Sequence, residues 1–227
     1  MAKIINAEEL QLHGFADASQ RAYGACIYLR SSNGGRHHSM LLCSKSRVAP
    51  VKIISLPRLE LCAAVLLIKL HKLVIRALKV KFSKVTFWSD SKIVLNWINT
   101  PSYKLETFEA NRIAQIQGAT NSDDWRHVPT EVNPADVISR GQMPADFLIN
   151  QLWKQGPIWL REEEENWPPK FQVTQDKQKS SDKIQVLTAG ITQRWNLWDA
   201  YSSLRKLIRV VAYCIRFGQN ALLKLHV

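Results

Sequence analysis

At 227 residues, the chain is long enough for one good-sized domain with an extension, or for two small domains. Its longest apolar run is interrupted by Lys69, Lys72 and Arg76, which argues against a membrane-spanning helix, and the N-terminal residues lack the apolar core of a signal peptide. Its 31 Lys and Arg residues outnumber 19 Asp and Glu residues, for a net charge of +12. Such an excess suits a polyanionic partner, most commonly nucleic acid.

Cysteine usage gives no sign of a disulfide framework. The cysteines are widely spaced, contain no CxxC pair, and mostly sit inside apolar segments; they are Cys26, Cys43, Cys62 and Cys214. We therefore expect reduced core residues in an intracellular protein.

The first 50 residues predict three strands. Residues 10–30 read as two strands with a turn near Ser19–Gln20, and residues 37–48 as a third strand. The intervening loop, SSNGG, contains glycines that permit a hairpin.

The periodicity changes after residue 55. From Leu56 to about Lys79, apolar residues recur at helical spacing, with Ser55 as a candidate N-cap and Pro57 in the first turn. KVTFWSD then predicts a buried parallel strand, SKIVLNWI and FEANRIAQIQGA predict helices, DDWRHVP a last strand, and NPADVISR a helix start. This order predicts an α/β fold: a five-stranded mixed sheet, an antiparallel meander plus parallel strands, flanked by helices.

The composition changes near residue 150. We expect a domain over residues 1–150, a connector and polar linker rich in Trp, Glu and Pro over 151–190, and an amphipathic basic helical tail over 191–227. The run EEEE at 162–165 is expected to be solvated or to pack against the basic tail.

Four acidic residues are expected where elements leave the sheet. Asp17 ends the first strand, Asp90 ends the fourth, and Asp136 opens the last helix. Glu60 lies in the first turn of the long helix that leads towards the fourth strand. Because the first and fourth strands are natural neighbours where the strand order reverses, we expect the four side chains to converge at one edge of the sheet.

Such a cluster is costly unless cations neutralise it. Two like charges about 4 Å apart repel by roughly 4 kcal/mol at an effective dielectric constant of about 20. Oxygen ligands suit Mg²⁺ or Mn²⁺, and a pair of these ions can activate water and stabilise the leaving oxygen in phosphodiester cleavage.

Each of these residues also has a structural explanation. Asp17 can be a turn residue, Asp90 a helix cap, and Asp136 an acid favoured by the helix dipole, while Glu60 can be exposed at a helix start. Taken singly these explanations are the simpler ones. Together they require a coincidence of position, and we therefore favour the metal site.

Four sequence motifs follow one another over about residues 10–141: GFADASQRAYGACIYLR, LPRLELCAAVLL, WSDSKIVLNWI and HVPTEVNPADVISRG. In this order they resemble the ribonuclease H domain of retroelement reverse transcriptases, most of all that of Bel/Pao long-terminal-repeat retrotransposons. The resemblance implies a ribonuclease H fold and hydrolysis of the RNA strand of an RNA–DNA hybrid with two metal ions. It implies catalytic and metal-binding roles for Asp17, Glu60, Asp90 and Asp136.

Two other functions are open. One is a catalytically idle ribonuclease H-like module that only positions the hybrid, against which the presence of all four carboxylates argues. The other is an integrase-type nuclease, which places its glutamate after two aspartates. Here Glu60 comes second in the order, which favours ribonuclease H.

The chain departs from the family pattern at a histidine. Many ribonucleases H carry a mobile histidine before the fourth carboxylate, and that position here aligns with Glu131. His127 falls earlier, and we expect a half-buried strand residue in preference to a proton-transfer group.

A row of basic residues follows the long helix: Lys69, Lys72, Arg76 and Lys79. The row is either an ordinary solvated face or a surface that tracks the phosphates of the hybrid without reading bases.

The resemblance also covers the tail, which is similar to the lead-in to a Bel/Pao integrase. We therefore expect the polymerase and integrase regions of a parent polyprotein as partners, and no membrane. The expected location is intracellular: cytoplasmic virus-like particles, with the nucleus as a second possibility.

Overall fold

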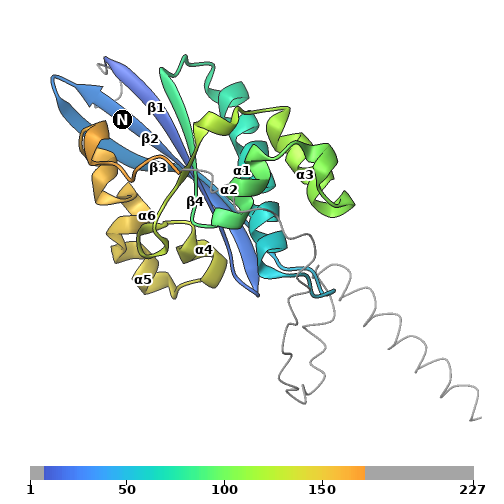
Figure 1. Cartoon of the computed structure of the whole chain (residues 1–227). Coiled ribbons are helices and arrows are strands. Elements are labelled where there is room, and N and C mark those ends of the chain that lie inside the picture. Colours follow the sequence, from blue (N-terminus) through green and yellow to red (C-terminus); the bar gives the residue numbers. More distant parts are fainter. Residues whose placement is uncertain (1–7, 172–227) are drawn as a thin grey trace, which may run out of the picture. The chain divides into compact units, whose positions relative to one another are not determined.

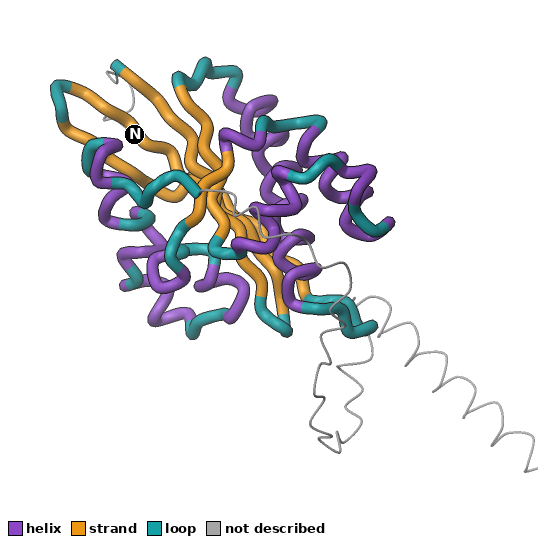
Figure 2. Tube along the Cα trace, in the orientation of Figure 1, coloured by secondary structure: helices purple, strands orange, loops and turns teal. Residues whose placement is uncertain are grey.

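In this computed structural model, residues 8–171 are described, and they contain a five-stranded mixed sheet of order β3-β2-β1-β4-β5 (Figures 1 and 2). β1 (Glu9–Ala18), β2 (Ala22–Asn33) and β3 (Arg36–Val48) form an antiparallel meander. β4 (Lys84–Ser89) pairs in parallel with β1, and β5 (Trp125–His127) pairs in parallel with β4. The fold predicted from the sequence is therefore confirmed, including the meander and the parallel strands.

The two hairpins of the meander are closed by the predicted turns. Gly34 and Gly35 join β2 to β3 with φ angles of 55° and 73°, a two-residue turn that side-chain-bearing residues rarely adopt. Between β1 and β2, the Ser19 hydroxyl accepts hydrogen bonds from the backbone N–H groups of Arg21 and Ala22 at 3.1 and 3.2 Å.

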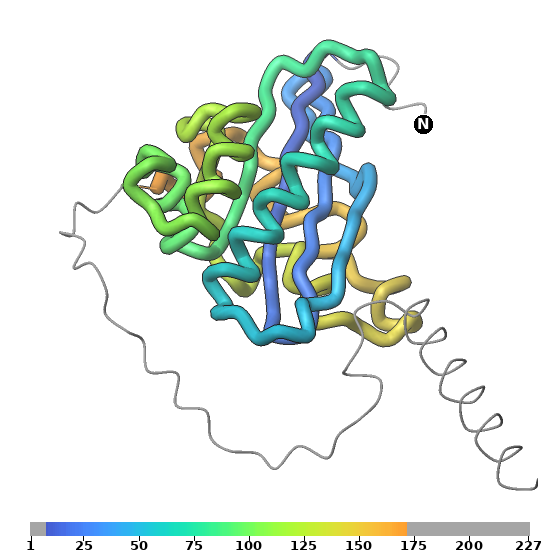
Figure 3. The backbone as a smooth tube through the Cα atoms, turned by 90° about the vertical axis from the view of Figure 1, so that its right-hand side faces the viewer, coloured from blue at the N-terminus to red at the C-terminus, as the bar shows by residue number. Residues whose placement is uncertain are grey.

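One face of the sheet is covered by α1 (Leu56–Leu78), with α2 (Lys92–Asn99) and α3 (Thr107–Gln117) beside it (Figure 3). Ser55 occupies the N-cap position of α1 without a side-chain cap bond, and the helix ends at Lys79, which has a left-handed φ of 50°.

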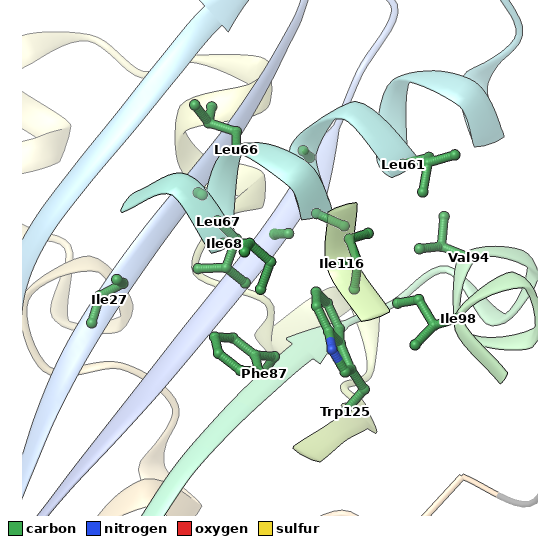
Figure 4. Close-up of a cluster of buried hydrophobic side chains, with 14 of the residues drawn as sticks. Ile27, Leu61, Leu66, Leu67, Ile68, Phe87, Val94, Ile98, Ile116 and Trp125 are labelled. Atoms are coloured by element: carbon green, nitrogen blue, oxygen red, sulfur yellow. The ribbon is translucent and has the colours of Figure 1, made fainter. Parts of the chain in front are cut away.

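The core under α1 is built from one side of each strand and the apolar stripe of the helix. Figure 4 shows Leu67, Phe87 and Trp125 within this cluster. A Cβ on Gly14 would lie 2.6 Å from the Leu67 side chain, so the absence of a side chain there lets α1 approach β1.

The opposite face is covered by α4 (Asp136–Arg140), α5 (Pro144–Ile149), α6 (Gln151–Gln155) and the segment after them (Figure 1). Its core is aromatic: the rings of Phe15 and Trp88 stack with centroids 6.0 Å apart. Because both faces are covered, the part of β1 from Gln11 to Ala18 is buried without interruption.

The sequence predicted a domain over residues 1–150. In the structure, residues 151–171 belong to the same compact unit as the sheet. Buried Arg30 donates to the backbone oxygens of Leu160 at 3.0 Å and Glu162 at 2.9 Å, and Tyr28 donates to that of Trp153 at 2.7 Å. We call residues 156–171 the C-terminal strap. The tryptophans that made this region read as a connector fill the aromatic core instead.

The acidic run at 162–165 is not simply solvated. Glu164 forms ion pairs with Lys84 and Arg126, both at 2.5 Å, and Glu163 lies 3.1 Å from His37. The basic partners come from the sheet, and a carboxylate near Lys84 and Arg126 offsets the cost of placing cations beside an aromatic core.

The remaining predictions on this part of the chain concern cysteines and membranes. Cys26 is buried, Cys43 and Cys62 are partly buried, and all three are free thiols. No helix in residues 8–171 is long and apolar enough to cross a membrane. The polar linker beyond residue 171, the basic tail and Cys214 lie outside the described residues.

Candidate active site

The strand register places Asp17 and Asp90 at the same edge of the sheet. Asp17 is the penultimate residue of β1, and Asp90 directly follows β4. Ala16 pairs with Ser89 in the parallel ladder between these strands, so the two aspartates leave adjacent strands together. The sequence prediction of neighbouring strand ends is confirmed for this pair.

Asp17 is buried, with 5% of its surface exposed, and faces α4. The Ser139 hydroxyl of α4 donates a hydrogen bond to Asp17 Oδ2. Burial, together with the charges of Asp90 and Asp136, raises the pKa of Asp17 to about 7, while the Ser139 hydrogen bond acts in the opposite direction. This carboxyl is thus mostly protonated below pH 7 and becomes mostly charged only above it.

The close packing of α4 against the strands depends on Gly24, the β2 partner of Asp17. A Cβ on Gly24 would lie 2.5 Å from Ile138 of α4. The Ser19 hydroxyl also donates to the backbone oxygen of Ser139 at 2.6 Å, which ties the β1–β2 turn to the same helix.

Asp90 is held by the loop that leads into α4. Burial raises the pKa of Asp90, hydrogen bonds with the side chains of Thr130 and Asn133 lower it, and the charge of Asp136 raises it. Its Oδ1 atom is buried without a hydrogen-bond partner in the described structure. A buried carboxylate oxygen with no donor is unusual, and it is the atom of this cluster that most needs a positive ligand.

The loop itself is locked by a buried amide. Asn133 Nδ2 donates to the backbone oxygen of Ala16 at 3.2 Å, and Asn133 Oδ1 accepts from the N–H of Ala135 at 3.1 Å. The same side chain therefore connects β1, Asp90 and the start of α4.

Glu60 lies in the first turns of α1, partly buried. Burial raises its pKa, a hydrogen bond with Ser91 lowers it, and the charge of Asp90 raises it. Glu60 is thus not a solvated residue at a helix start. It reaches the cluster through Asp90 and Ser91.

The structural explanation of Asp90 as a helix cap is wrong. Ser91 is the N-cap of α2, and its hydroxyl accepts from the N–H of Val94 at 3.3 Å. Asp90 is therefore left for another role.

Asp136 is the first residue of α4, as expected, and it forms an ion pair with Arg140 on the same helix. Its charge acts on both Asp17 and Asp90. The three aspartates are electrostatically coupled, and Glu60 is coupled to Asp90.

The chemical type of the four side chains suits a hard cation. All four groups offer carboxylate oxygens, which Mg²⁺ and Mn²⁺ prefer, and one buried oxygen of Asp90 lacks a partner. In residues 8–171, however, no group of three or more His, Cys, Asp or Glu side chains is arranged to hold a metal ion. The carboxylates are near enough to shift one another's pKa, without forming a finished coordination shell.

His127 lies in β5 and is half-buried, as the sequence predicted. Its pKa is lowered by burial and by Lys92, while a hydrogen bond with the backbone of Asp90 acts in the opposite direction. Glu131 is exposed in a short 3₁₀ turn, Thr130–Val132.

The basic row Lys69, Lys72, Arg76 and Lys79 is exposed along α1 and forms no ion pair within residues 8–171.

Sequence reasoning missed the supporting residues of the site: Asn133, Ser139 and Arg140. Their signal was the NPADVISR segment, in which Ser139 and Arg140 follow Asp136 at helical spacings of three and four.

Comparison with known proteins agrees with the motif resemblance over part of the chain. Residues 1–91 match the family model described as the Pao retrotransposon-like RNaseH-like domain. The matched region contains Asp17, Glu60 and Asp90 and ends before Asp136. No curated protein sequence matches the chain.

Solved structures similar to this chain are ribonuclease H domains. The N-terminal RNase H domain of a Mycobacterium tuberculosis protein has 14% identity and a TM-score of 0.40, covering 58% of this chain and 92% of that one. RNase H1 of the archaeon Halobacterium salinarum has 12% identity and a TM-score of 0.34, covering 56% and 90%. LC11-RNase H1, isolated from compost and solved with an RNA/DNA hybrid, has 16% identity and a TM-score of 0.34, covering 56% and 91%.

Proposed function

We propose that this chain, whose residues 1–91 match the RNaseH-like domain of Pao retrotransposons, is a metal-dependent endonuclease that hydrolyses the RNA strand of RNA–DNA hybrids during reverse transcription. The observation that carries the proposal is that Asp17 and Asp90 leave adjacent strands at one edge of the sheet. The charge of Asp136 acts on both of them, and the charge of Asp90 acts on Glu60.

Asp17, Glu60, Asp90 and Asp136 would hold two Mg²⁺ or Mn²⁺ ions, which supply an activated water and stabilise the leaving oxygen. Asp90 Oδ1 needs a positive partner, which supports a ligand role for this residue. Asp17 must lose the proton that its raised pKa retains near neutral pH before it can bind a cation.

The residues around the carboxylates fix their positions. Ser139 holds Asp17, while Thr130 and Asn133 hold Asp90 from the loop between β5 and α4. Ser91 joins Glu60 to the start of α2. These positioning residues keep four carboxylates from distant parts of the sequence at one edge despite their repulsion.

The basic row on α1 would follow the hybrid's phosphates. The polymerase and integrase regions of a parent polyprotein would be the partners, and intracellular virus-like particles the location. The partners and the location rest on the resemblance to Pao retrotransposons alone.

The decisive experiment incubates the chain with labelled RNA–DNA hybrid, RNA duplex and DNA duplex, each with Mg²⁺ or with EDTA. We expect cutting of the RNA strand of the hybrid, only with the metal. Equal cutting of duplex DNA, or cutting that survives EDTA, would contradict the proposal. Tight hybrid binding with no cutting under any metal would identify an idle positioning module instead.

A further inference from the structure

A pocket of about 170 Å³ opens beside α1, between elements far apart in the sequence. Its lining includes Tyr23 from β2, Arg47 from β3, Arg112 from α3, and Val65 and Lys69 from α1. Figure 3 shows α1 lying between α3 and the β2–β3 side of the sheet, which explains how these segments meet.

The pocket carries three cations and no carboxylate. Arg47, Lys69 and Arg112 all line it, and none of them forms an ion pair within the described residues. Elsewhere in the same structure, basic side chains beside an apolar core are neutralised, as Lys84 and Arg126 are by Glu164. Three unpaired like charges around one hollow create a positive potential that an anion would relieve.

The pocket is also partly pre-formed. The Arg112 guanidinium lies 3.4 Å from the centroid of the Phe108 ring, and its Nη1 donates to the backbone oxygen of Phe108 at 2.9 Å. A guanidinium has five N–H donors, so most of Arg112 stays available to a ligand. The apolar side chains of Val65 and Leu66 in the wall strengthen electrostatic attraction by excluding water.

We propose that this pocket binds a phosphate group, and that in the nucleic-acid complex it holds a backbone phosphate of the hybrid. Arginine forks match phosphate oxygens in a planar, two-point geometry, while lysine supplies a compact charge. The first half of the proposal stands by itself. The second half rests on the proposed function.

The position of the pocket suits a contact near the reaction site. Tyr23 pairs with Ala18, the residue after Asp17. Lys69 lies nine residues after Glu60 on α1, about 13 Å along the helix axis. A phosphate in the pocket would therefore sit a few nucleotides from the carboxylates, at the head of the basic row. Sequence reasoning assigned Lys69 to that row, but it missed Arg47 and Arg112.

The test compares the full-length parent with the triple variant Arg47→Gln, Lys69→Gln, Arg112→Gln. A matched control, Arg36→Gln, Lys81→Gln, Lys154→Gln, removes the same charge from exposed positions that do not line the pocket. Hybrid affinity is measured in EDTA, so that cleavage plays no part, at several salt concentrations. We expect the pocket variant to bind about tenfold more weakly and to lose about one unit of slope in log affinity against log salt, while the control stays close to the parent.

Equal changes in the pocket variant and the control would show a general charge effect and overturn the hybrid contact, as would an unchanged pocket variant. A parent that binds no hybrid would instead overturn the proposed function. The proposed phosphate site is tested separately by comparing the melting temperature in inorganic phosphate with that in chloride of equal ionic strength. A higher melting temperature in phosphate for the parent and the control, but not for the pocket variant, supports a phosphate site. The same change in melting temperature for all three proteins overturns it. If the triple variant melts early in chloride, the single change Lys69→Gln is used instead, with a smaller expected shift in the same direction.

Discussion

Arg140 Nε donates to the Asp136 carboxylate one helical turn earlier in α4, so a guanidinium of the chain itself lies against a predicted metal ligand. The hydrogen bond with Asp136 and its charge raise the pKa of Arg140, and the charges of Asp17 and Asp90 act in the same direction. Arg140 thus serves as a counter-cation for the aspartate cluster, and a metal ion must compete with it for Asp136.

This competition predicts the behaviour of Arg140→Gln. In EDTA the variant should lose no more than about 0.5 kcal/mol of unfolding free energy, because Arg140 is exposed and the pair is spaced i,i+4. The Mg²⁺ concentration at half-maximal thermal stabilisation should fall, because Asp136 is freed. Arg36→Gln, a change on the β2–β3 hairpin, is the control and should leave that midpoint unchanged. A higher Mg²⁺ midpoint in Arg140→Gln would show that Arg140 supports metal binding.

The raised pKa of Asp17 predicts how the stability of the metal-free protein depends on pH. The unfolded carboxyl releases its proton near pH 3.8, whereas the folded one keeps it until about pH 7. Between these values the folded state binds more protons, so this residue makes stability fall as pH rises, by at most about 1.4 kcal/mol per pH unit. Asp17→Asn should therefore be more stable than the parent at pH 8, with a flatter profile from pH 4 to 7.

The measurement is urea unfolding in EDTA at several pH values, with the exposed Asp123→Asn as control. Asparagine can still accept the Ser139 hydrogen bond, so the comparison isolates the charge. A variant less stable than the parent at pH 8 would mean that the charged form of Asp17 is favourable in the fold. Cleavage by the parent should increase with pH through about 7, as Asp17 becomes free to bind a cation.

Glu60→Gln separates the metal site from an ordinary structural role. Because burial and the charge of Asp90 raise the pKa of Glu60, the metal-free variant should be as stable as the parent or more stable at pH 8. Its stabilisation by Mg²⁺ and its cleavage should be largely lost. Thermal melts with EDTA and with Mg²⁺, together with the cleavage assay, test both statements, with the exposed Glu165→Gln as control. A destabilised Glu60→Gln with a normal Mg²⁺ response would remove Glu60 from the site.

We expect a substitution in the C-terminal strap, away from the carboxylates, to lower the stability of the fold strongly. Trp167 is buried in the aromatic core, and the Arg30 guanidinium lies 5.2 Å from its ring centroid. Trp167→Ala should cost about 3–5 kcal/mol of unfolding free energy, as for other buried aromatic residues. The exposed Ile158→Ala in the same strap should cost far less. Equal, small losses in chemical unfolding would show that the strap is not part of the core.

Truncation tests whether the segment after residue 150 is part of the folded domain. A chain ending at residue 150 would leave Arg30 and Tyr28 without their backbone acceptors, and we expect it to unfold or aggregate. A chain ending at residue 190 keeps the strap and should retain hybrid cleavage. Circular dichroism and the cleavage assay distinguish the two truncations. A folded, active chain ending at residue 150 would show that the domain ends there, as the sequence predicted.

The sequence by itself determined the order and type of the strands and helices from β1 to α4, because that information is local. Alternating apolar residues, the glycine pair 34–35 and the helical spacing from Leu56 onward each act over a few neighbouring residues. It also determined where Asp17 and Asp90 leave the sheet, because the rules of strand connection leave few arrangements for a meander followed by crossover units.

Tertiary structure decided which individual groups contact one another. The coupling of Glu60 to Asp90, the bond from Ser139 to Asp17 and the pairing of Glu164 with Arg126 join residues 30 to 122 positions apart. The pocket likewise draws its cations from β3, α1 and α3. The burial of Leu160 and Trp167 escaped sequence reasoning for the same reason. Prolines and glutamates predict a solvated segment locally, whereas these two side chains are buried because they pack on a face of the sheet. Burial is a property of what packs against a residue, and no window of neighbouring residues contains it.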